Sequence, residues 1–444
     1  MVSVKLAFVG VVLVVGCTKT NPAAFCADGT CIDPNFPYCD TDGAVGGEAG
    51  TCIAVTCTPG KIKQCNNAAA LTCNAAGNGY EDVACGLGCA DAPTAHCKYL
   101  QPKYLPNVCD APAAKPSVTL SSTGSLDPNL DTNCDEVVTQ AGGTNICVVR
   151  AGTITITSSA NMKVLGTSDA AGRAIAFVAD DQITVDGTVD AAGHTAVNGP
   201  GGGAYSSGGG PMDTTFRAGG GAGGATDGGD GATQTTTSGG IDGGAMNGGA
   251  TVMNPALLAS FIGGGSAGGA AGFWGGGGGA VMFVSCHGEV KVTGTINAGG
   301  GGGAAGIAVF LALIAHGGGA GGYVVIQGVS VSVTGQVFAN GGGGGGGWLT
   351  TGAEGMPGAD GTTSDVFGAS GGNLVGGSGR GGTGGFKDNR PTQGTHPTAN
   401  GAGAGGGGGS VGFLQTYTPS GTTATLTPSH VSPAFQPNGV VELR

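Results

Sequence analysis

A repeated unit of 21 to 23 residues limits the possible folds of this chain more than any other feature of its sequence. Three copies cover residues 172–193, 278–300 and 321–341, and a degenerate fourth copy begins near residue 409. Each copy holds two short runs of apolar and β-branched residues, an Asp-Gly or Thr-Gly corner, and a third, shorter run. This pattern predicts short strands joined by turns. One unit is too small to be stable alone, and stacking successive units would bury their apolar edges.

We therefore expect a mainly β fold, in which small disulfide-rich N-terminal modules precede a glycine-rich, parallel β-helix or β-solenoid-like domain. The sequence Val-Asp-Gly-Thr-Val-Asp-Ala at residues 185–191 resembles one coil of a right-handed parallel β-helix, where Gly or Asn turns the corner between sheets. A β-sandwich of hairpins with glycine-rich loops is the alternative fold.

Long glycine tracts separate the repeats, and 79 of the 99 glycines lie between residues 187 and 412. Such tracts are either disordered loops, because glycine loses the most conformational entropy on ordering, or packed polyglycine-II segments with three residues per turn. Aromatic side chains interrupt the tracts at Phe273, Trp274 and Trp348, which a spacer would not need. This favours the ordered interpretation.

The N-terminal part of the chain is rich in cysteine. Apart from Cys17 the sequence has 14 cysteines, and 13 of them lie between residues 26 and 147. Such density is typical of exported modules held by disulfides. Residues 26–52 look like an EGF-like knot, and a hairpin-based unit follows. Because 13 is odd, either Cys286 pairs with one of these cysteines or a free thiol remains. The disulfide candidates are Cys26, Cys31, Cys39, Cys52, Cys57, Cys65, Cys73, Cys85, Cys89, Cys97, Cys109, Cys134 and Cys147.

The first 17 residues predict export and lipid attachment. Lys5 precedes an apolar run over residues 6–15, which is shorter than the roughly 20 residues that span a bilayer but fits a signal peptide. Val-Val-Gly-Cys at residues 14–17 resembles the bacterial lipobox, although Leu is commoner than Val at its first position. The resemblance implies cleavage between Gly16 and Cys17 and lipid, such as palmitate, on Cys17. An ordinary signal peptide cut elsewhere is the alternative.

Composition divides the chain into five segments. We expect a lipoprotein signal peptide at 1–16, a tether at 17–25, Cys-rich disulfide modules at 26–110, a Pro/Ser/Thr-rich linker at 111–125, and the glycine-rich β-repeat domain at 126–444.

No motif supplies a complete catalytic constellation. Two Gly-x-Ser-x-Gly matches, centred on Ser266 and Ser370, are expected by chance in glycine-rich sequence, and neither joins a strand to a helix as a nucleophile elbow requires. The best acidic candidates for a polysaccharide lyase or hydrolase are Asp180, Asp181, Asp186 and Asp190. The later repeats carry Cys, His, Thr and Asn at these positions, so we expect solvated turn carboxylates and no acidic ladder.

Other ligand classes are also poorly supported. His287 and Glu289 follow Cys286 closely, without a third ligand of metal-site spacing, so we expect no metal and no cofactor. A formal net charge of −12, with only 16 Lys and Arg, argues against nucleic acid as a partner. Trp274 and Trp348 could stack on sugars, and packing against the repeat core is the alternative for both.

The lipobox at residues 14–17, the Cys-rich units and the glycine-rich β domain together resemble a group of predicted surface lipoproteins common in myxobacteria and their relatives. The resemblance implies a location and an architecture, and no reaction. Thr18 after the lipidated cysteine goes with the outer membrane in such lipoproteins.

The leading hypothesis is a non-enzymatic envelope lipoprotein, anchored to the outer membrane through Cys17 and facing the periplasm or the cell surface. Its β-repeat domain would be structural or adhesive, with an envelope or extracellular polysaccharide as a partner. The alternative is a β-helix polysaccharide-active enzyme, a lyase or hydrolase.

Overall fold

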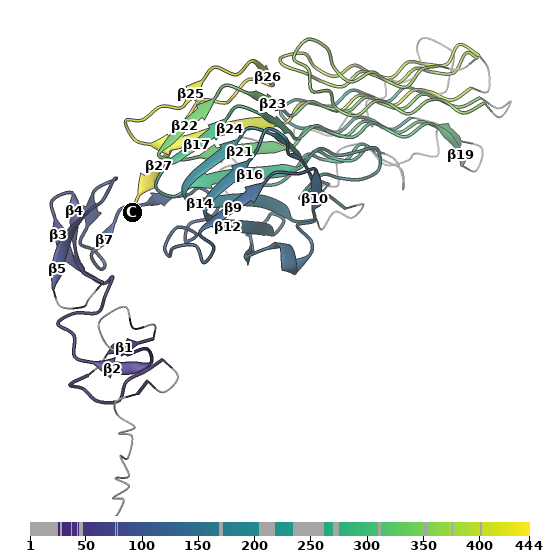
Figure 1. Ribbon diagram of the computed structural model, residues 1–444. Coiled ribbons are helices and arrows are strands. Elements are labelled where there is room, and N and C mark those ends of the chain that lie inside the picture. The colour runs from purple at the N-terminus through teal and green to yellow at the C-terminus, as the bar shows by residue number, and fades with distance from the viewer. Residues whose placement is uncertain are drawn as a thin grey trace, which may run out of the picture. The chain divides into compact units, whose positions relative to one another are not determined.

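The chain folds into β-strands and one short 3-10 turn, Asp131–Asn133, among the residues that the structure describes (Figure 1). This computed structural model describes all residues except 1–24, 27–28, 37, 42, 44–47, 76, 78, 168–171, 204–217, 234–261, 270–274, 310–311, 350–352, 375 and 400–401. The expected mainly β class is confirmed. The chain divides into two compact units, residues 1–98 and 99–444.

The smaller unit consists of short antiparallel strands with few buried side chains. Its buried apolar residues are mostly half-cystines, together with Ala70. A module with so little apolar surface to bury depends on covalent cross-links for stability. Its strands are β1 (Tyr38–Asp40) paired with β2 (Thr51–Ile53), the sheet β3 (Ile62–Asn66), β4 (Ala69–Cys73) and β5 (Tyr80–Ala84), and β6 (Cys89–Ala90) paired with β7 (His96–Cys97).

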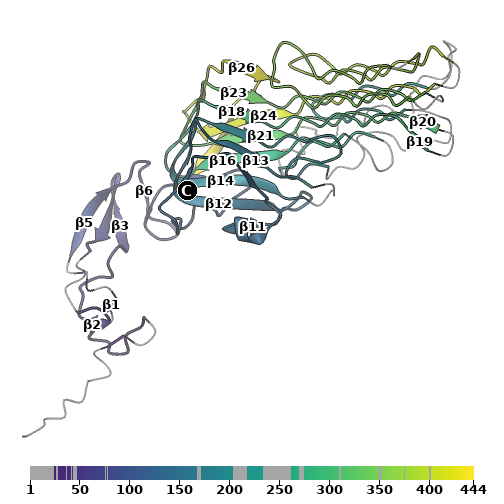
Figure 2. The ribbon, with the colours of Figure 1, turned by 45° about the vertical axis from the view of Figure 1, so that its right-hand side comes forward.

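In the larger unit the repeats lie side by side as parallel strands in register (Figure 2). One line of paired residues runs from Ile175 through Val281 and Val324 to Leu414. The larger sheet contains β9 (Ser117–Leu120), β11 (Glu136–Val138), β12 (Ile146–Ile156), β14 (Ala174–Val185), β16 (Ala280–Ser285), β17 (Glu289–Val292), β21 (Tyr323–Gln327), β22 (Ser330–Val333), β24 (Phe413–Pro419), β25 (Thr425–Leu426), β27 (Gly439–Leu443) and β8 (Leu100–Gln101).

A second, six-stranded sheet contains the third short run of each repeat together with two strands that precede the first repeat. Its register joins Val189 to Ile296, Val337 and Val431 in neighbouring strands. Corresponding positions in the sequence repeats are therefore direct neighbours in space. The strands are β10 (Gly124–Leu126), β13 (Asn161–Val164), β15 (Thr188–Asp190), β18 (Thr295–Asn297), β23 (Gln336–Phe338) and β26 (His430–Ser432).

Two apolar clusters cover the two faces of the larger sheet. Ile175 and Phe177 of β14 pack into a core with the second sheet, and the ring of Phe177 stacks on Phe283 at 5.4 Å. Ala176 and Val178, which alternate with them, pack against Leu105 and its neighbours on the opposite face. A strand buried on both faces needs an unbroken apolar run. The sequence Ala-Ile-Ala-Phe-Val-Ala at residues 174–179 supplies it.

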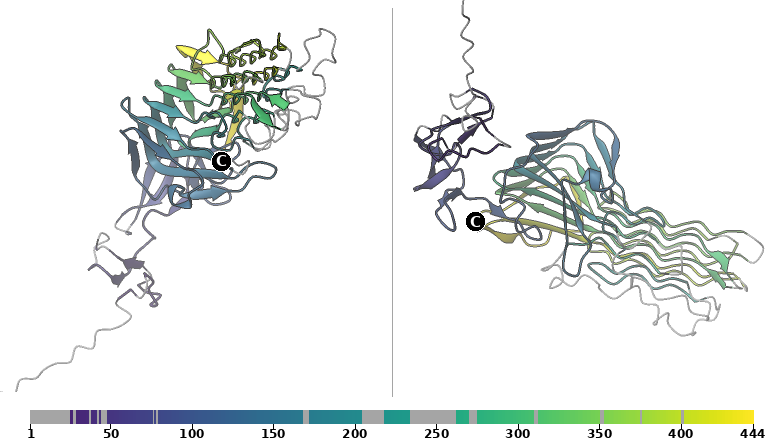
Figure 3. Two further views of the ribbon diagram at one scale, coloured as in Figure 1. Left: turned by 90° about the vertical axis from the view of Figure 1, so that its right-hand side faces the viewer. Right: turned by 90° about the horizontal axis from the view of Figure 1, so that it is seen from below.

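The described glycine tracts form an ordered array of extended segments that run side by side (Figure 3). Successive backbone N–H groups of the tract 341–347 donate to different segments, and the same segment returns every third residue. Gly341, Gly344 and Gly347 donate to Gly385, Gly382 and Gly379. The intervening donors point to segments 316–319 and 356–359. This three-residue period is that of polyglycine-II, so the ordered interpretation is confirmed for these tracts.

Close packing of backbone on backbone explains why the tracts are glycine. A Cβ added to Gly344 would lie 2.1 Å from the carbonyl oxygen of Gly406, and one added to Gly345 would lie 1.9 Å from that of Ala304. Segments 303–306, 372 and 406–409 donate back to the same tract, so it has six hydrogen-bonded neighbours. The paired strands β19 (Ile307–Val309) and β20 (Ala312–Ile314) lie at the far end of the array (Figure 2).

The division between the two compact units differs in position from the expected end of the Cys-rich modules. The division falls between Lys98 and Tyr99 and not at residue 110, because β8 pairs with β27 and Cys109 is bonded to Cys286. The expected linker 111–125 contains β9 and most of β10, both of which belong to the sheets. Its Ser-Val-Thr-Leu sequence has the alternation of an edge strand, which its proline and serine content obscured.

Candidate functional site

The predicted lipidation site cannot be placed in the structure. Gly16 and Cys17 lie outside the described residues, as does the apolar run before them. In the part of the chain that the structure describes, no helix is long and apolar enough to cross a membrane.

The disulfide predictions are confirmed. All 13 candidate cysteines are paired, and Cys286 accounts for the odd number by reaching back to Cys109 across 177 residues. The pairs are Cys26–Cys39, Cys31–Cys52, Cys57–Cys73, Cys65–Cys89, Cys85–Cys97, Cys109–Cys286 and Cys134–Cys147.

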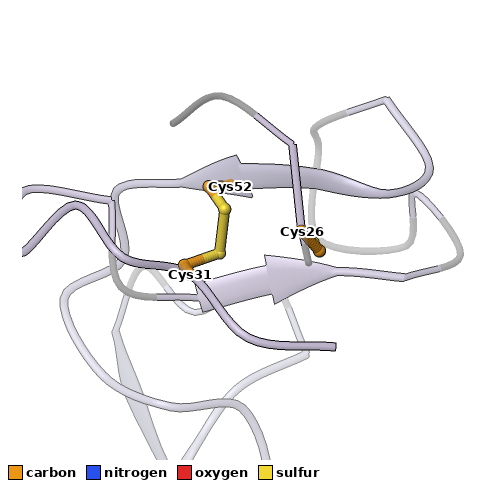
Figure 4. Close-up of side chains that lie close together, drawn as sticks. All are labelled: Cys26, Cys31 and Cys52. Atoms are coloured by element: carbon orange, nitrogen blue, oxygen red, sulfur yellow. A yellow bond between two sulfur atoms is a disulfide. The ribbon is translucent and has the colours of Figure 1, made fainter. Parts of the chain in front are cut away.

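Three sulfur atoms in the first module lie close together. Those of Cys26, Cys31 and Cys52 are within 4.8 Å of one another (Figure 4). Cys31 is bonded to Cys52, and Cys26 to Cys39. A sulfur in a disulfide is not a thiolate, so this group is a covalent cross-link and not a metal site.

Two of the four candidate aspartates make internal contacts that the sequence did not predict. Asp180 forms an ion pair of 2.9 Å with Arg150, and each side chain is only about 15% exposed. Its second oxygen accepts a hydrogen bond of 2.7 Å from the backbone N–H of Ala113. Asp190 accepts one of 3.0 Å from Asn297, its partner in the next repeat. The expectation of solvated carboxylates is wrong for these two residues.

The other two aspartates are exposed, as expected. The carboxylate of Asp186 accepts a hydrogen bond from the hydroxyl of Thr293 in the next repeat, and Asp181 offers its backbone carbonyl to Ser285. The four carboxylates therefore hold separate positions along the chain. The side chains of Asp186 and Asp190 bond to the next repeat, and that of Asp180 bonds to residues that precede the first repeat.

His287 and Glu289 do not form a metal site with Cys286, because that sulfur is in a disulfide. The ring Nδ1 of His287 lies 3.0 Å from the carbonyl oxygen of Asp180. The same ring packs edge-on against Tyr99, with the ring centroids 6.4 Å apart. Among the described residues, the half-cystine group above is the one cluster with metal-ligand proximity.

The two serines of the Gly-x-Ser-x-Gly matches belong to the glycine array. The carbonyl of Ser266 accepts a hydrogen bond from Ala320, and that of Ser370 accepts one from Ala359. Within the described residues, no helix follows either serine.

Of the two candidate sugar-stacking residues, Trp274 lies outside the described residues. Trp348 is half-buried at the end of the tract 341–347, where its carbonyl accepts a hydrogen bond of 2.6 Å from Gly403. Its role in glycan contact stays a prediction.

Two histidine–aspartate pairs were not predicted, because their partners are distant in the sequence. The ring of His194 lies 2.9 Å from Asp360, which also accepts hydrogen bonds from the N–H groups of Thr195 and Gly302. The bond to Asp360 raises the pKa of His194 above its usual value. Asp365 similarly bonds to His430 and Lys387, both at 3.1 Å. Both aspartates lie in segment 353–374, so these pairs fasten it to the repeats.

A tyrosine cluster was also missed, in which Tyr323 is buried and Tyr104 and Tyr417 are half-buried. The hydroxyl of Tyr104 lies 3.1 Å from that of Tyr323 and 3.3 Å from that of Tyr417. Burial raises the pKa of both Tyr104 and Tyr323 well above the usual range, so these phenols stay neutral.

A scan against protein-family models, a search of curated proteins and a search of solved structures each found no match to this chain.

Proposed function

We propose that this protein is a non-enzymatic lipoprotein of the bacterial cell envelope. Lipid on Cys17 would hold it in the outer membrane, with a structural or adhesive β-repeat domain facing the periplasm or the cell surface. The lipobox-like residues 14–17 support this location. Seven disulfides also support it, because such bonds persist on the oxidising side of the envelope and are rare in the cytosol.

The repeats in this proposal are coils of a parallel β-solenoid, each contributing strands to both sheets. The support is the continuous register across copies, in which Ile183 pairs with Val290 and Val290 with Val331. In such an architecture each coil is stabilised mainly by its two neighbours, and the coil number sets the length of the scaffold.

The glycine array is the single observation that carries the structural role. Its segments are cross-linked by backbone hydrogen bonds in several directions, and substitution of almost any buried glycine would force backbone apart. Glycine has the highest entropic cost of ordering, so an array of this size needs all of these bonds to stay folded. A rigid plate of this kind suits a scaffold.

A column of hydroxyl-bearing side chains on the larger sheet, interrupted by Lys291, supports a polysaccharide partner. Thr119, Thr155 and Thr184 are direct neighbours in adjacent strands, and Ser332 and Thr425 continue the line after Lys291. Hydroxyl groups both donate and accept hydrogen bonds, as sugar hydroxyls require.

Intact mass spectrometry of the membrane-extracted protein tests the anchor. We expect a mass that lacks residues 1–16 and carries diacylglycerol and acyl groups. Cys17→Ala should release soluble or uncut protein, because one lost lipidation site removes all the chains needed for stable anchoring. An unlipidated mature protein cut elsewhere would contradict the proposal.

A further inference from the structure

We propose that a groove at the start of the larger unit is a carbohydrate-binding site. It has a volume of about 600 Å³, within the range of small-ligand sites, and is open at one side. Residues of three segments line it: 101–106, 138–141 and 440–442. The inference rests on the adhesive function proposed above and names the place where it would act.

The backbone at the groove wall is held in one conformation by the repeats. The buried side chain of Gln327 binds the backbone of Lys103 twice, accepting from its N–H at 2.7 Å and donating to its carbonyl at 3.1 Å. Gln327 ends β21, so the core of the repeat stack fixes a residue that lines the groove.

The next residue, Tyr104, has a strained backbone. Its φ of +72° lies in the left-handed region, which a bulky residue rarely adopts. The hydroxyl contacts with Tyr323 and Tyr417 and the edge-on packing of the three rings hold it there. Strain that neighbouring residues maintain in this way is concentrated at ligand sites, and it preorganises the wall before any ligand arrives.

The rim offers both donors and acceptors. Lys103 supplies an ammonium group, Glu442 a carboxylate, and Gln101, paired opposite Glu442, an amide. Among the described residues, neither Lys103 nor Glu442 takes part in an ion pair. Val440, on the same face of β27 as Glu442, is 65% exposed. The exposed Pro106 and the buried Pro102 add apolar atoms to the lining beside these polar groups.

This combination fits a sugar better than a peptide. A sugar presents C–H groups on its ring faces and hydroxyls at its edge, which match an aromatic and apolar wall with donors and acceptors around it. An extended peptide gains most of its affinity by adding a strand to a free sheet edge. β27 pairs with β24 over residues 439–441 and with β8 over residues 442–443, so no more than three consecutive residues are left unpaired on either side.

The test is a glycan array probed with the full-length protein, carrying bacterial-envelope and plant cell-wall oligosaccharides. The best-bound oligosaccharide is then titrated against the double variant Lys103→Ala/Glu442→Gln. The matched control is Lys163→Ala/Glu354→Gln, which makes the same two changes at exposed residues of the larger unit that do not line the groove. Tyr104→Ala provides a second groove variant, and the rim double variant leaves the tyrosine cluster in place if Tyr104→Ala fails to fold.

We expect the groove double variant to bind at least about ten-fold more weakly, the loss typical of hydrogen bonds to charged groups, while the control stays close to wild type. Equal weakening in both variants, or none in either, would overturn the inference and leave the adhesive proposal standing. If the wild-type protein bound no oligosaccharide, both the groove inference and the adhesive proposal would be overturned. The lipid anchor on Cys17 is tested separately, by intact mass. Capture of a peptide-library ligand lost in the groove variant, without sugar binding, would overturn the carbohydrate assignment.

Discussion

Single glycines in this molecule are under unusually strong steric constraint. In most folds a buried glycine is required by a left-handed backbone, but the tract 341–347 has none at positive φ. Here the restriction comes from neighbouring backbone on several sides of the segment. The hydrogen-bonded segments approach one another so closely that only a hydrogen atom fits at each Cα. Glycine is therefore a packing residue in this array, as leucine is in an ordinary core.

Gly344→Ala should consequently be destabilising. Its Cβ would meet the carbonyl oxygen of Gly406 at 2.1 Å, and overpacking of this kind costs about 1–3 kcal/mol of unfolding free energy. Gly124→Ala is the matched control, because a Cβ there has nothing within 4 Å. Thermal unfolding of both variants measures the difference. A Tm for Gly344→Ala equal to that of the control would show that the segments can separate at little cost.

His316 should make the stability of the glycine array depend on pH. It is 2% exposed, and burial lowers its pKa from 6.5 to about 4. The unfolded chain thus binds one more proton than the folded chain between these values, so stability is full above about pH 6.5 and falls as pH drops toward 4. The loss is on the order of 3 kcal/mol.

Denaturant unfolding at pH 7 and pH 4.5 checks this prediction. His316→Gln, which cannot gain the proton, should lose less stability between the two values than wild type does. The exposed His287→Gln is the control and should behave as wild type. An unchanged pH response in His316→Gln would mean that another group causes the acid sensitivity.

At the scale of elements, the sequence predicted what is local and missed what is assembled from distant segments. The strand pattern of β14, β16 and β21 is visible in the repeats because alternation and β-branching act within a few residues. The same copies then pair in register, so sequence alignment of the repeats also gave the neighbours. Cysteine parity likewise restricted Cys286 to two states, of which pairing proved correct.

The glycine tracts and the polar contacts could not be predicted in the same way. The six neighbours of the tract 341–347 come from segments spread between residues 300 and 412, and nothing in a run of glycine specifies which segments adjoin it. The Asp360–His194 and Tyr104–Tyr323 contacts join residues 166 and 219 positions apart. Asp180 was misjudged because its partner Arg150 lies on a neighbouring strand, where pairing excludes water from both side chains.

At the scale of the whole molecule, the start and the end of the larger unit are hydrogen-bonded to each other. The C-terminal strand β27 pairs with β8, near the start of this unit, and Arg444 exchanges backbone hydrogen bonds with Tyr99. The segment that carries Leu100, Leu105 and Cys109 covers the outer face of β14 and β16. The N-terminal segment therefore acts as a cover for the first repeats, and the groove of the proposed sugar site lies along it.

The Cys109–Cys286 bond should then contribute more to stability than the Cys134–Cys147 bond. It closes a loop of 177 residues, against 13 for the other, and a longer loop loses more entropy when cross-linked in the unfolded chain. From this loop entropy we expect Cys109→Ser/Cys286→Ser to lower the free energy of unfolding by about 5 kcal/mol, and Cys134→Ser/Cys147→Ser to lower it by about 3 kcal/mol. Replacing both cysteines of a pair avoids a free thiol in each variant. Chemical denaturation of the two double variants compares them, and a smaller loss for Cys109→Ser/Cys286→Ser would indicate that the N-terminal segment is held chiefly by its apolar contacts.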